Sequence, residues 1–256
     1  MENIFDTHAH YDDEAFNEDR EELLGLLQNK GVSHVLTCGT DLMSSYRSLQ
    51  LAQKYDFIYC AMGFHPEDIA EERKGDLDVI RDLLKSEPKA VAVGEIGLDY
   101  HYDDGAPREE QIDLFRRQIE MAKELDLPVI VHDRDAHEDT FNILKEMRPK
   151  GVVHCFSGSV EMAKEYVKFG FYIGVGGVVT FKNARKAVEV VEAVPVESIL
   201  LETDCPYMAP TPFRGQRNDS SLISYVAEKI AEIKGLTPQE VCDITNKNAK
   251  EFLGIK

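Results

Sequence analysis

The sequence lacks any apolar run long enough to cross a lipid bilayer, and no signal peptide is visible at its start. A membrane-spanning helix needs roughly 20 consecutive apolar residues. The chain begins Met-Glu-Asn-Ile and passes directly into an expected strand, without the charged and apolar regions of a signal peptide. We therefore expect a cytoplasmic protein that does not interact with membranes.

Paired cysteines are missing as well. The five cysteines are odd in number, are scattered along the chain and form no Cys-x-x-Cys motif. Disulfide frameworks belong mainly to secreted proteins, whereas cytosolic thiols stay reduced. We expect reduced and mostly buried thiols at Cys38, Cys60, Cys155, Cys205 and Cys242.

Positive charge is scarce. The chain has 29 lysine and arginine residues against 47 aspartate and glutamate residues, which gives a formal net charge of −18. Such a balance argues against a protein that coats itself with nucleic acid by bulk attraction. It still permits a small cleft, made locally positive by metal ions or a few arginines, that acts on a phosphate ester.

The sequence contains no linker, no break in composition, no low-complexity segment and no Gly-rich dinucleotide fingerprint after its first expected strand. A hydrophobic content of 43% and a charged content of 30% are typical of globular proteins. A chain of 256 residues is long enough to bury the core of one α/β barrel. We predict a single domain over residues 1–256.

Short apolar runs alternate with longer segments of helical periodicity along the chain. The eight expected strands are Ile4–Asp6, Val32–Cys38, Phe57–Met62, Ala90–Gly94, Pro128–His132, Gly151–Cys155, Phe171–Gly174 and Ser198–Glu202. Helices are expected near 14–29, 43–55, 76–86, 108–126, 136–147, 160–169, 183–193, 219–234 and 237–252. Eight strand–helix units predict a TIM (β/α)8 barrel with extra C-terminal helices, the last of which begins at Thr237-Pro238-Gln239-Glu240 with a capping box.

Two histidines, His8 and His10, follow the first apolar run at a spacing of two residues. Side chains at that spacing on a strand point to the same face, so both imidazoles could bind one metal ion. An isolated His-x-His pair is weak support for a metal site, because such pairs also occur on ordinary surfaces. The interpretation therefore depends on whether other strands supply further ligands.

Other expected strands do end in residues that bind metals. The chemistry of a TIM barrel lies at the carboxyl ends of its strands. Six candidate ligands occur at these ends: His8, His10, Glu95, His132, His154 and Asp204. Burying four imidazoles and two carboxylates around one barrel mouth without a cation would be costly, whereas a cation makes the same group favourable. We therefore predict a metal centre.

Six ligands are more than one tetrahedral ion needs, so we predict two divalent ions. Glu95 is expected to bridge them, with His8, His10 and Asp204 on one ion and His132 and His154 on the other. Water held between the ions would lose a proton near neutral pH and become the nucleophile, with Asp204 orienting it or accepting its proton. Nitrogen and oxygen ligands fit Zn²⁺, Mn²⁺, Ni²⁺ or Mg²⁺, and four imidazoles argue against Mg²⁺ alone.

Several motifs together resemble the TatD family of metal-dependent deoxyribonucleases, from Phe5 to Asn248. These motifs are FDTHAH (5–10), GFHP (63–66), GEIGLD (94–99), PVIVHDR (128–134), HCFSG (154–158), LETDCP (201–206) and PFRGQRN (212–218). The resemblance implies an amidohydrolase-type TIM barrel with a two-metal centre that hydrolyses phosphodiesters. The family's ligand positions match the six residues already identified, and the complete His-x-His pair resembles the subgroup with a full binuclear site. The resemblance also implies either 3′→5′ exonuclease activity or D-aminoacyl-tRNA deacylase activity, and it does not choose between them.

A phosphodiesterase also needs cations or donors for the non-bridging oxygens of its substrate. His65 follows the third expected strand, Arg134 follows His132, and Arg214 and Arg217 lie in the loop after the eighth strand. We predict these four as substrate-binding residues. For Arg134 and Arg217, a salt bridge to a loop carboxylate is an equally good interpretation.

Three functions remain open from the sequence. The first is a nuclease that acts on DNA or another phosphoester, at ends or in single strands, because nothing in the chain resembles a reader of duplex grooves. The second is an ester or amide hydrolase, including an aminoacyl-tRNA deacylase, that uses the same nucleophile on a carbonyl. The third is a scaffold in which metal is purely structural, which predicts ions fully saturated by protein ligands. A monomer is compatible with the sequence, which leaves the oligomeric state open.

Overall fold

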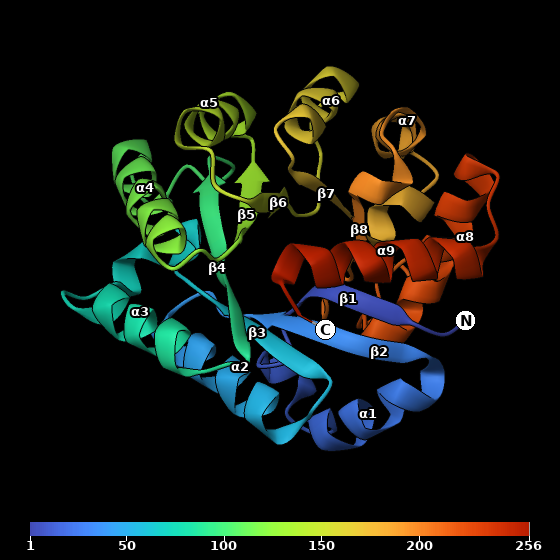
Figure 1. Ribbon diagram of the computed structural model, residues 1–256, viewed down its shortest axis with the longest axis horizontal. Coiled ribbons are helices and arrows are strands. Elements are labelled where there is room, and N and C mark those ends of the chain that lie inside the picture. Colours follow the sequence, from blue (N-terminus) through green and yellow to red (C-terminus); the bar gives the residue numbers. More distant parts are fainter. Residues whose placement is uncertain (256) are drawn as a thin grey trace.

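The computed structural model describes residues 1–255, in which eight parallel strands curve into a barrel surrounded by helices (Figure 1). The strands are β1 (Ile4–Ala9), β2 (Val32–Cys38), β3 (Ile58–Met62), β4 (Ala90–Asp99), β5 (Val129–Arg134), β6 (Gly151–Val153), β7 (Tyr172–Val175) and β8 (Ile199–Leu201). They follow one another around the sheet in sequence order. The predicted TIM barrel is therefore confirmed, and its strand ends define one mouth.

Nine α-helices lie among the described residues. They are α1 (Arg20–Leu27), α2 (Leu42–Lys54), α3 (Asp76–Ser86), α4 (Arg108–Glu124), α5 (His137–Met147), α6 (Val160–Lys168), α7 (Arg185–Ala193), α8 (Ile223–Lys234) and α9 (Pro238–Leu253). Helix α9 begins as predicted, with Thr237 as N-cap, Pro238 in the first turn and a capping box to Glu240.

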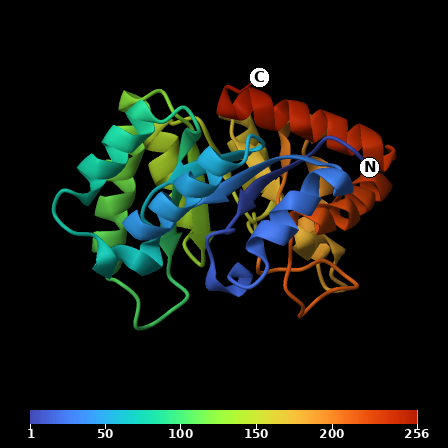
Figure 2. The same ribbon diagram turned by 90° about the horizontal axis from the view of Figure 1, so that it is seen from below.

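Helix α9 closes the end of the barrel opposite the mouth. Its residues Ala249, Phe252 and Leu253 pack on an interior cluster that includes Phe5 and Leu200. In Figure 2 this helix lies along one edge of the molecule, while the loops that follow β1, β4 and β8 project from the other edge. The extra C-terminal helix therefore seals the apolar interior and leaves the mouth open to solvent.

Strand β4 is longer than predicted, because it continues through Gly94 and Glu95 to Asp99. The predicted strand ended at Gly94, but the pairing with β5 continues, and Gly97 pairs with His132. A β-carbon at Gly97 would overlap the carbonyl oxygen of His132, so glycine here permits two strands to approach closely. As a result, Glu95 lies within β4 rather than after it, and Asp99 occupies the strand's end.

The segments that contain β1 and β8 meet at a parallel bridge between Ala9 and Cys205 and at a backbone hydrogen bond of 2.9 Å from Asp204 N–H to the carbonyl of His8. The Asp6 carboxylate reinforces this seam, because it accepts hydrogen bonds from the backbone N–H and the hydroxyl of Thr203 at 3.0 and 2.6 Å. The hydroxyl of Ser220 donates a third hydrogen bond of 2.6 Å to the same carboxylate. The seam positions His8 and Asp204 beside each other at the mouth.

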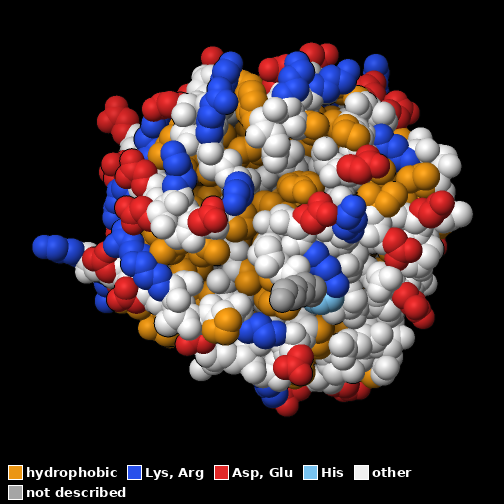
Figure 3. Space-filling view, in the orientation of Figure 1, with side chains coloured by type: hydrophobic (Ala, Val, Ile, Leu, Met, Phe, Trp, Pro, Cys, Tyr) orange, Lys and Arg blue, Asp and Glu red, His pale blue; other side chains and the backbone are white. Residues whose placement is uncertain are grey.

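Charged side chains cover the outer surface (Figure 3), and the cysteines are unpaired as expected. On the face shown in Figure 3, acidic and basic side chains are interspersed around the rim. All five cysteines are free thiols. Among residues 1–255, no helix combines the length and apolar character needed to cross a membrane.

Candidate metal centre

The barrel brings all six predicted ligand residues together at its mouth. His8 lies in β1 and His10 directly follows it, Glu95 and His132 lie in β4 and β5, and His154 and Asp204 follow β6 and β8. The side chains of His8, Glu95 and His154 are at most 5% exposed. Polar groups buried this deeply need partners, and here they face one another.

Glu95 stands at the middle of this cluster. Its Oε2 atom lies 3.2 Å from Nε2 of His8 and 3.4 Å from Nε2 of His10. Its Oε1 atom lies 2.7 Å from Nε2 of His154 and 3.0 Å from Nδ1 of His132. Each carboxylate oxygen therefore faces a different pair of histidines.

The spacing of these donor atoms suits metal ions. Ligands bound to one ion at about 2.1 Å lie up to about 4.2 Å apart. Three overlapping groups have ligand atoms within 4.8 Å of one another: His8–His10–Glu95, His8–His154–Asp204 and His65–Glu95–His132. All of these donors are imidazole nitrogens or carboxylate oxygens, so the residues fit divalent ions that accept mixed N and O ligands.

The histidines carry unequal proton affinities. Burial lowers the pKa of His10, but the carboxylates of Asp204 and Glu95 outweigh burial and raise that pKa well above its ordinary value. Burial also lowers the pKa of His132, but the hydrogen bonds to Asp99 and Glu95 outweigh burial and raise that pKa to about 10. Burial and the charge of His154 lower the pKa of His8 to about 4. Burial lowers the pKa of His154 as well, but the charge of Glu95 outweighs burial and raises that pKa. Three of the four histidines thus have raised pKa values, and a metal ion must displace the protons that they hold.

Outer partners orient the histidine rings, and sequence reasoning gave them no role. Nδ1 of His10 lies 2.9 Å from the carbonyl oxygen of Cys38, and Nδ1 of His8 lies 3.6 Å from the Cys38 thiol. The Asp99 carboxylate lies 2.9 Å from Nε2 of His132. Such partners commonly fix the tautomer and orientation of metal-binding histidines.

Glu202 is a second buried carboxylate without a predicted role. Its Oε1 accepts a hydrogen bond of 2.5 Å from the backbone N–H of Cys155, while its Oε2 has no hydrogen-bond partner among the described residues. Burial raises the pKa of this carboxyl to about 8, although the charge of His154 opposes the shift. A β-carbon at Gly174 would overlap the Glu202 carboxylate, so the glycine makes room for it.

His65 lies closer to the cluster than a role in substrate binding alone suggested. Its Nε2 is 3.6 Å from Oε1 of Glu95. Its Nδ1 accepts a hydrogen bond from the backbone N–H of Glu67, and burial with the charge of His132 lowers its pKa to about 3. A neutral ring that accepts at Nδ1 carries its proton on Nε2, so His65 presents an N–H donor to the mouth.

A pocket of about 1060 Å³ opens above the cluster, and its lining includes His65 and Arg134 but, among the described residues, neither Arg214 nor Arg217. Arg214 lies over the ring of Phe181 at 4.4 Å. Arg217 forms an ion pair with Asp19, with 2.8 Å between Nη1 and Oδ1. Cys155 also lines the pocket.

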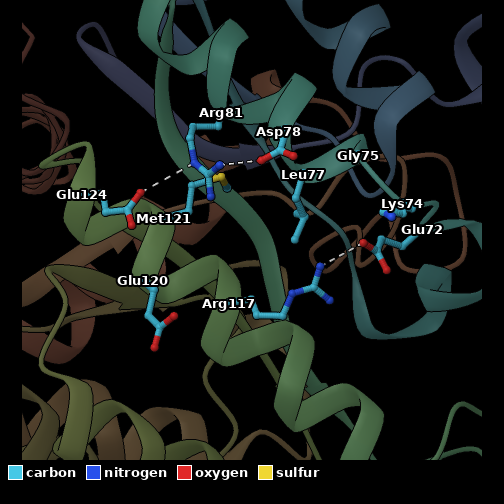
Figure 4. Close-up of a pocket in the computed structure, with 10 residues that line it drawn as sticks. All are labelled: Glu72, Lys74, Gly75, Leu77, Asp78, Arg81, Arg117, Glu120, Met121 and Glu124. Carbon is cyan, nitrogen blue, oxygen red and sulfur yellow. Dashed lines mark hydrogen bonds and ion pairs between the residues drawn. The ribbon is translucent and has the colours of Figure 1, made fainter.

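A smaller cleft of about 300 Å³ lies on the outer surface between α3 and α4 (Figure 4). Its arginines already face carboxylates, since Arg81 pairs with Asp78 and Glu124 and Arg117 pairs with Glu72. Their charge is therefore compensated within the protein. The larger pocket, which holds the histidine cluster, is the candidate active site.

Comparisons with known proteins find similarity to metal-dependent hydrolases. A sequence model described as TatD related DNase matches residues 5–254. The chain is 46% identical over 255 residues to YabD of Bacillus subtilis, described as an uncharacterised metal-dependent hydrolase, and the match covers 98% of this chain and 99% of that protein. It is 32% identical over 262 residues to the 3′-5′ ssDNA/RNA exonuclease TatD of Citrobacter koseri, with 98% and 99% coverage.

A solved structure shares the whole architecture. The crystal structure of YjjV, a TatD homologue from Escherichia coli K12, superposes with a TM-score of 0.93 at 34% sequence identity. The alignment covers 99% of each chain. The length, the fold and the order of the elements are therefore common to both proteins.

Proposed function

The chain belongs to the TatD related DNase family, whose members include metal-dependent hydrolases, and on that premise we propose that it hydrolyses phosphodiester bonds in nucleic acid with two divalent metal ions. Single-stranded ends are the proposed substrate, cleaved in the 3′→5′ direction. The relative named as an exonuclease on single-stranded DNA and RNA supports this choice. The cytoplasmic location stays a prediction.

The position of Glu95 between two pairs of histidines is the observation that carries the proposal. We assign His8, His10 and Asp204 to one ion, His132 and His154 to the other, and Glu95 to both. Zn²⁺, Mn²⁺, Ni²⁺ and Mg²⁺ are the candidate ions. Ions bound there would supply Lewis acidity and a lowered pKa for water near the scissile bond.

The protein's own side chains then have distinct tasks. Asp204 is the proposed proton acceptor, because Oδ1 lies 3.5 Å from Nε2 of His10 and its carboxylate borders the pocket. His65 offers its Nε2–H to a non-bridging oxygen, and Arg134 adds a positive charge at the rim. Arg214 and Arg217 could reach a substrate only by leaving Phe181 and Asp19.

Hydrolysis of an aminoacyl ester, such as that of a D-aminoacyl-tRNA, is the second candidate. One observation favours it: carboxylates at Asp12 and Glu67 also line the pocket and would attract the ammonium group of an aminoacyl ester. The same nucleophile would attack a carbonyl carbon instead of phosphorus. A purely structural metal site agrees less well with membership in a family of hydrolases.

Assays on metal-depleted protein test the proposal. The protein is reconstituted with Mn²⁺, Mg²⁺, Zn²⁺ or Ni²⁺ and incubated in parallel with an end-labelled single-stranded oligonucleotide and with D-aminoacyl-tRNA. We expect metal-dependent shortening of the oligonucleotide, and its loss in Glu95→Ala with the circular dichroism spectrum unchanged. Deacylation without cleavage would favour the second candidate, and full turnover by Glu95→Ala would contradict the two-ion mechanism.

A further inference from the structure

The pocket above the cluster has two walls of opposite charge. Strands β1–β3 and β5–β7 lie on opposite sides of the eight-stranded barrel, because the strands follow one another in order. The loops after β1 and β3 contribute four carboxylates, which we call the acidic wall: Asp12, Asp13, Glu67 and Asp68. Across the mouth, β5 and the start of α7 contribute three cations, which we call the basic wall: Arg134, Arg185 and Lys186.

Nearby cations compensate the acidic wall only in part, and the charge of Arg134 acts on Glu67. Arg47 approaches Asp12, with 3.9 Å between its Nε and the Oδ2 of that carboxylate. Asp13 is bound by neutral donors, since it accepts hydrogen bonds from the hydroxyl of Tyr207 and the backbone N–H of Ala15. This wall therefore presents a negative potential to any group that enters the pocket on the β1–β3 side.

The basic wall retains cations that a substrate could use. No carboxylate among the described residues lies within 4.0 Å of the Lys186 ammonium, whereas Arg185 pairs with Glu189 at 2.7 Å. Arg134 lies over the ring of Tyr102 and is 4.0 Å from Asp99. Asp133, which also lines this side, is paired with His137 at 2.8 Å.

An apolar surface adjoins the cations of the basic wall. Phe156, Val178 and Ala187 line the same side of the pocket. A single strand of nucleic acid needs cations for its phosphate groups and apolar side chains for its bases. The basic wall thus suits a polynucleotide chain, and the acidic wall does not.

We propose that the acidic wall is a specificity element that restricts cleavage to chain ends bearing a free hydroxyl. This proposal rests on the phosphodiesterase function proposed above and adds a rule for its substrate. The chain continues from the scissile phosphate along the basic wall only. Water would break the bond between phosphorus and the 3′ oxygen of the chain, which takes up a proton. The terminal residue then leaves toward the acidic wall as a nucleoside 5′-phosphate, and the remaining chain again ends in a 3′-hydroxyl. A terminal phosphate, or a following nucleotide, would meet Asp12, Asp13 and Glu67 and be repelled.

A set of matched oligonucleotides tests this rule. One oligonucleotide sequence is prepared with a 3′-hydroxyl, with a 3′-phosphate and as a closed circle. Two further forms carry a 5′-hydroxyl or a 5′-phosphate. At the 3′ end, we expect the hydroxyl form to be hydrolysed at least about tenfold faster than the phosphate form, because like charges a few ångström apart in a cleft oppose binding. The circle should resist cleavage.

Glu67→Gln removes one charge from the acidic wall, and Glu228→Gln is the matched control on α8, outside the pocket. The readout is the ratio of rates on the hydroxyl and phosphate ends. The substitution could also lower activity on both substrates, for example through the neighbouring Asp99. Such a loss affects both rates equally and therefore leaves their ratio unchanged. We expect Glu67→Gln to reduce the ratio several-fold and Glu228→Gln to leave it unchanged.

Three results would overturn the inference in distinguishable ways. Equal rates on the two linear forms, or ready cleavage of the circle, would refute the role of the acidic wall and leave the phosphodiesterase intact. If Glu67→Gln leaves the ratio unchanged, the preference for hydroxyl ends does not come from the acidic wall. Failure to cleave any oligonucleotide would contradict the proposed function, and this inference with it.

Discussion

The Asp99 carboxylate lies 2.9 Å from Nε2 of His132, on the opposite side of the imidazole from Glu95, which lies 3.0 Å from Nδ1. The ring is thereby held between two carboxylates at the mouth of the barrel. Burial raises the pKa of Asp99, but hydrogen bonding from His132 and the N–H of His101 outweighs it and lowers the pKa to about 2. Asp99 is therefore ionised at neutral pH and can fix the orientation of His132.

We predict that Asp99→Asn weakens the binding of one of the two metal ions by about 10- to 100-fold, because the partner that orients His132 is altered. Isothermal titration of metal-depleted protein with Zn²⁺ or Mn²⁺ measures the effect. The affinity of the other ion should change little, and Asp82→Asn on the exposed surface of α3 serves as the control. Wild-type affinities at both sites in Asp99→Asn would contradict this role.

Loss of the Asp6 carboxylate should destabilise the barrel at the seam between β1 and β8. Asp6→Ala leaves the buried donors of Thr203 and Ser220 without their acceptor. We expect the free energy of unfolding to fall by about 3 kcal/mol. Urea denaturation of metal-depleted protein measures it, and Ser220→Ala, which removes a single donor, should cost less. Equal stability of Asp6→Ala and wild type would show that the seam does not depend on this carboxylate.

Metal affinity should rise with pH across the neutral range. The raised pKa values of His10 and His132 mean that both rings are protonated in the metal-free protein at neutral pH, and each must lose a proton to become a ligand. Lower pH therefore favours the protonated, metal-free state. Titrations in buffers of different ionisation enthalpy should detect proton release on binding. Affinity that is constant between pH 6 and pH 9 would be inconsistent with these protonation states.

Binding of oligonucleotides should be weak and sensitive to salt, because the protein has a net charge of −18 and, among the described residues, the lysines and arginines that line the pocket are those of the basic wall. Each phosphate contact contributes a slope of about −0.7 to the dependence of log affinity on log salt for single strands. Lys186→Gln should reduce the magnitude of that slope by about 0.7. Fluorescence anisotropy at several salt concentrations tests this, with Lys85→Gln on α3 as a control that keeps the wild-type slope.

The rhythm of strands and helices could be read from the sequence because each barrel strand is a short apolar run and each helix carries a periodic stripe. The positions of His132 and His154 followed from the rule that chemistry lies at strand ends. The full extent of β4 did not follow, because Gly94 and Gly97 have the composition of a turn. Their actual reason is the close approach of β5, which only the three-dimensional structure reveals.

The sequence did not predict the residues that act by positioning another residue. Asp99 and Glu202 look like ordinary strand-end carboxylates until their partners, His132 and the N–H of Cys155, are placed beside them. Arg217 had two interpretations of equal merit, and the structure places it in an ion pair with Asp19. These two residues are 198 positions apart, so no local pattern in the sequence indicates that they pair.

The metal content of purified protein tests the central claim most directly. Wild-type protein and Glu95→Gln are saturated with Mn²⁺ or Zn²⁺ and then freed of excess ion. Elemental mass spectrometry then gives the number of metal ions bound per chain. Because both oxygens of Glu95 face histidine pairs, we predict two ions per chain in wild type and fewer than two in Glu95→Gln, with the fold retained. Two ions per chain in both proteins would contradict a centre built on Glu95.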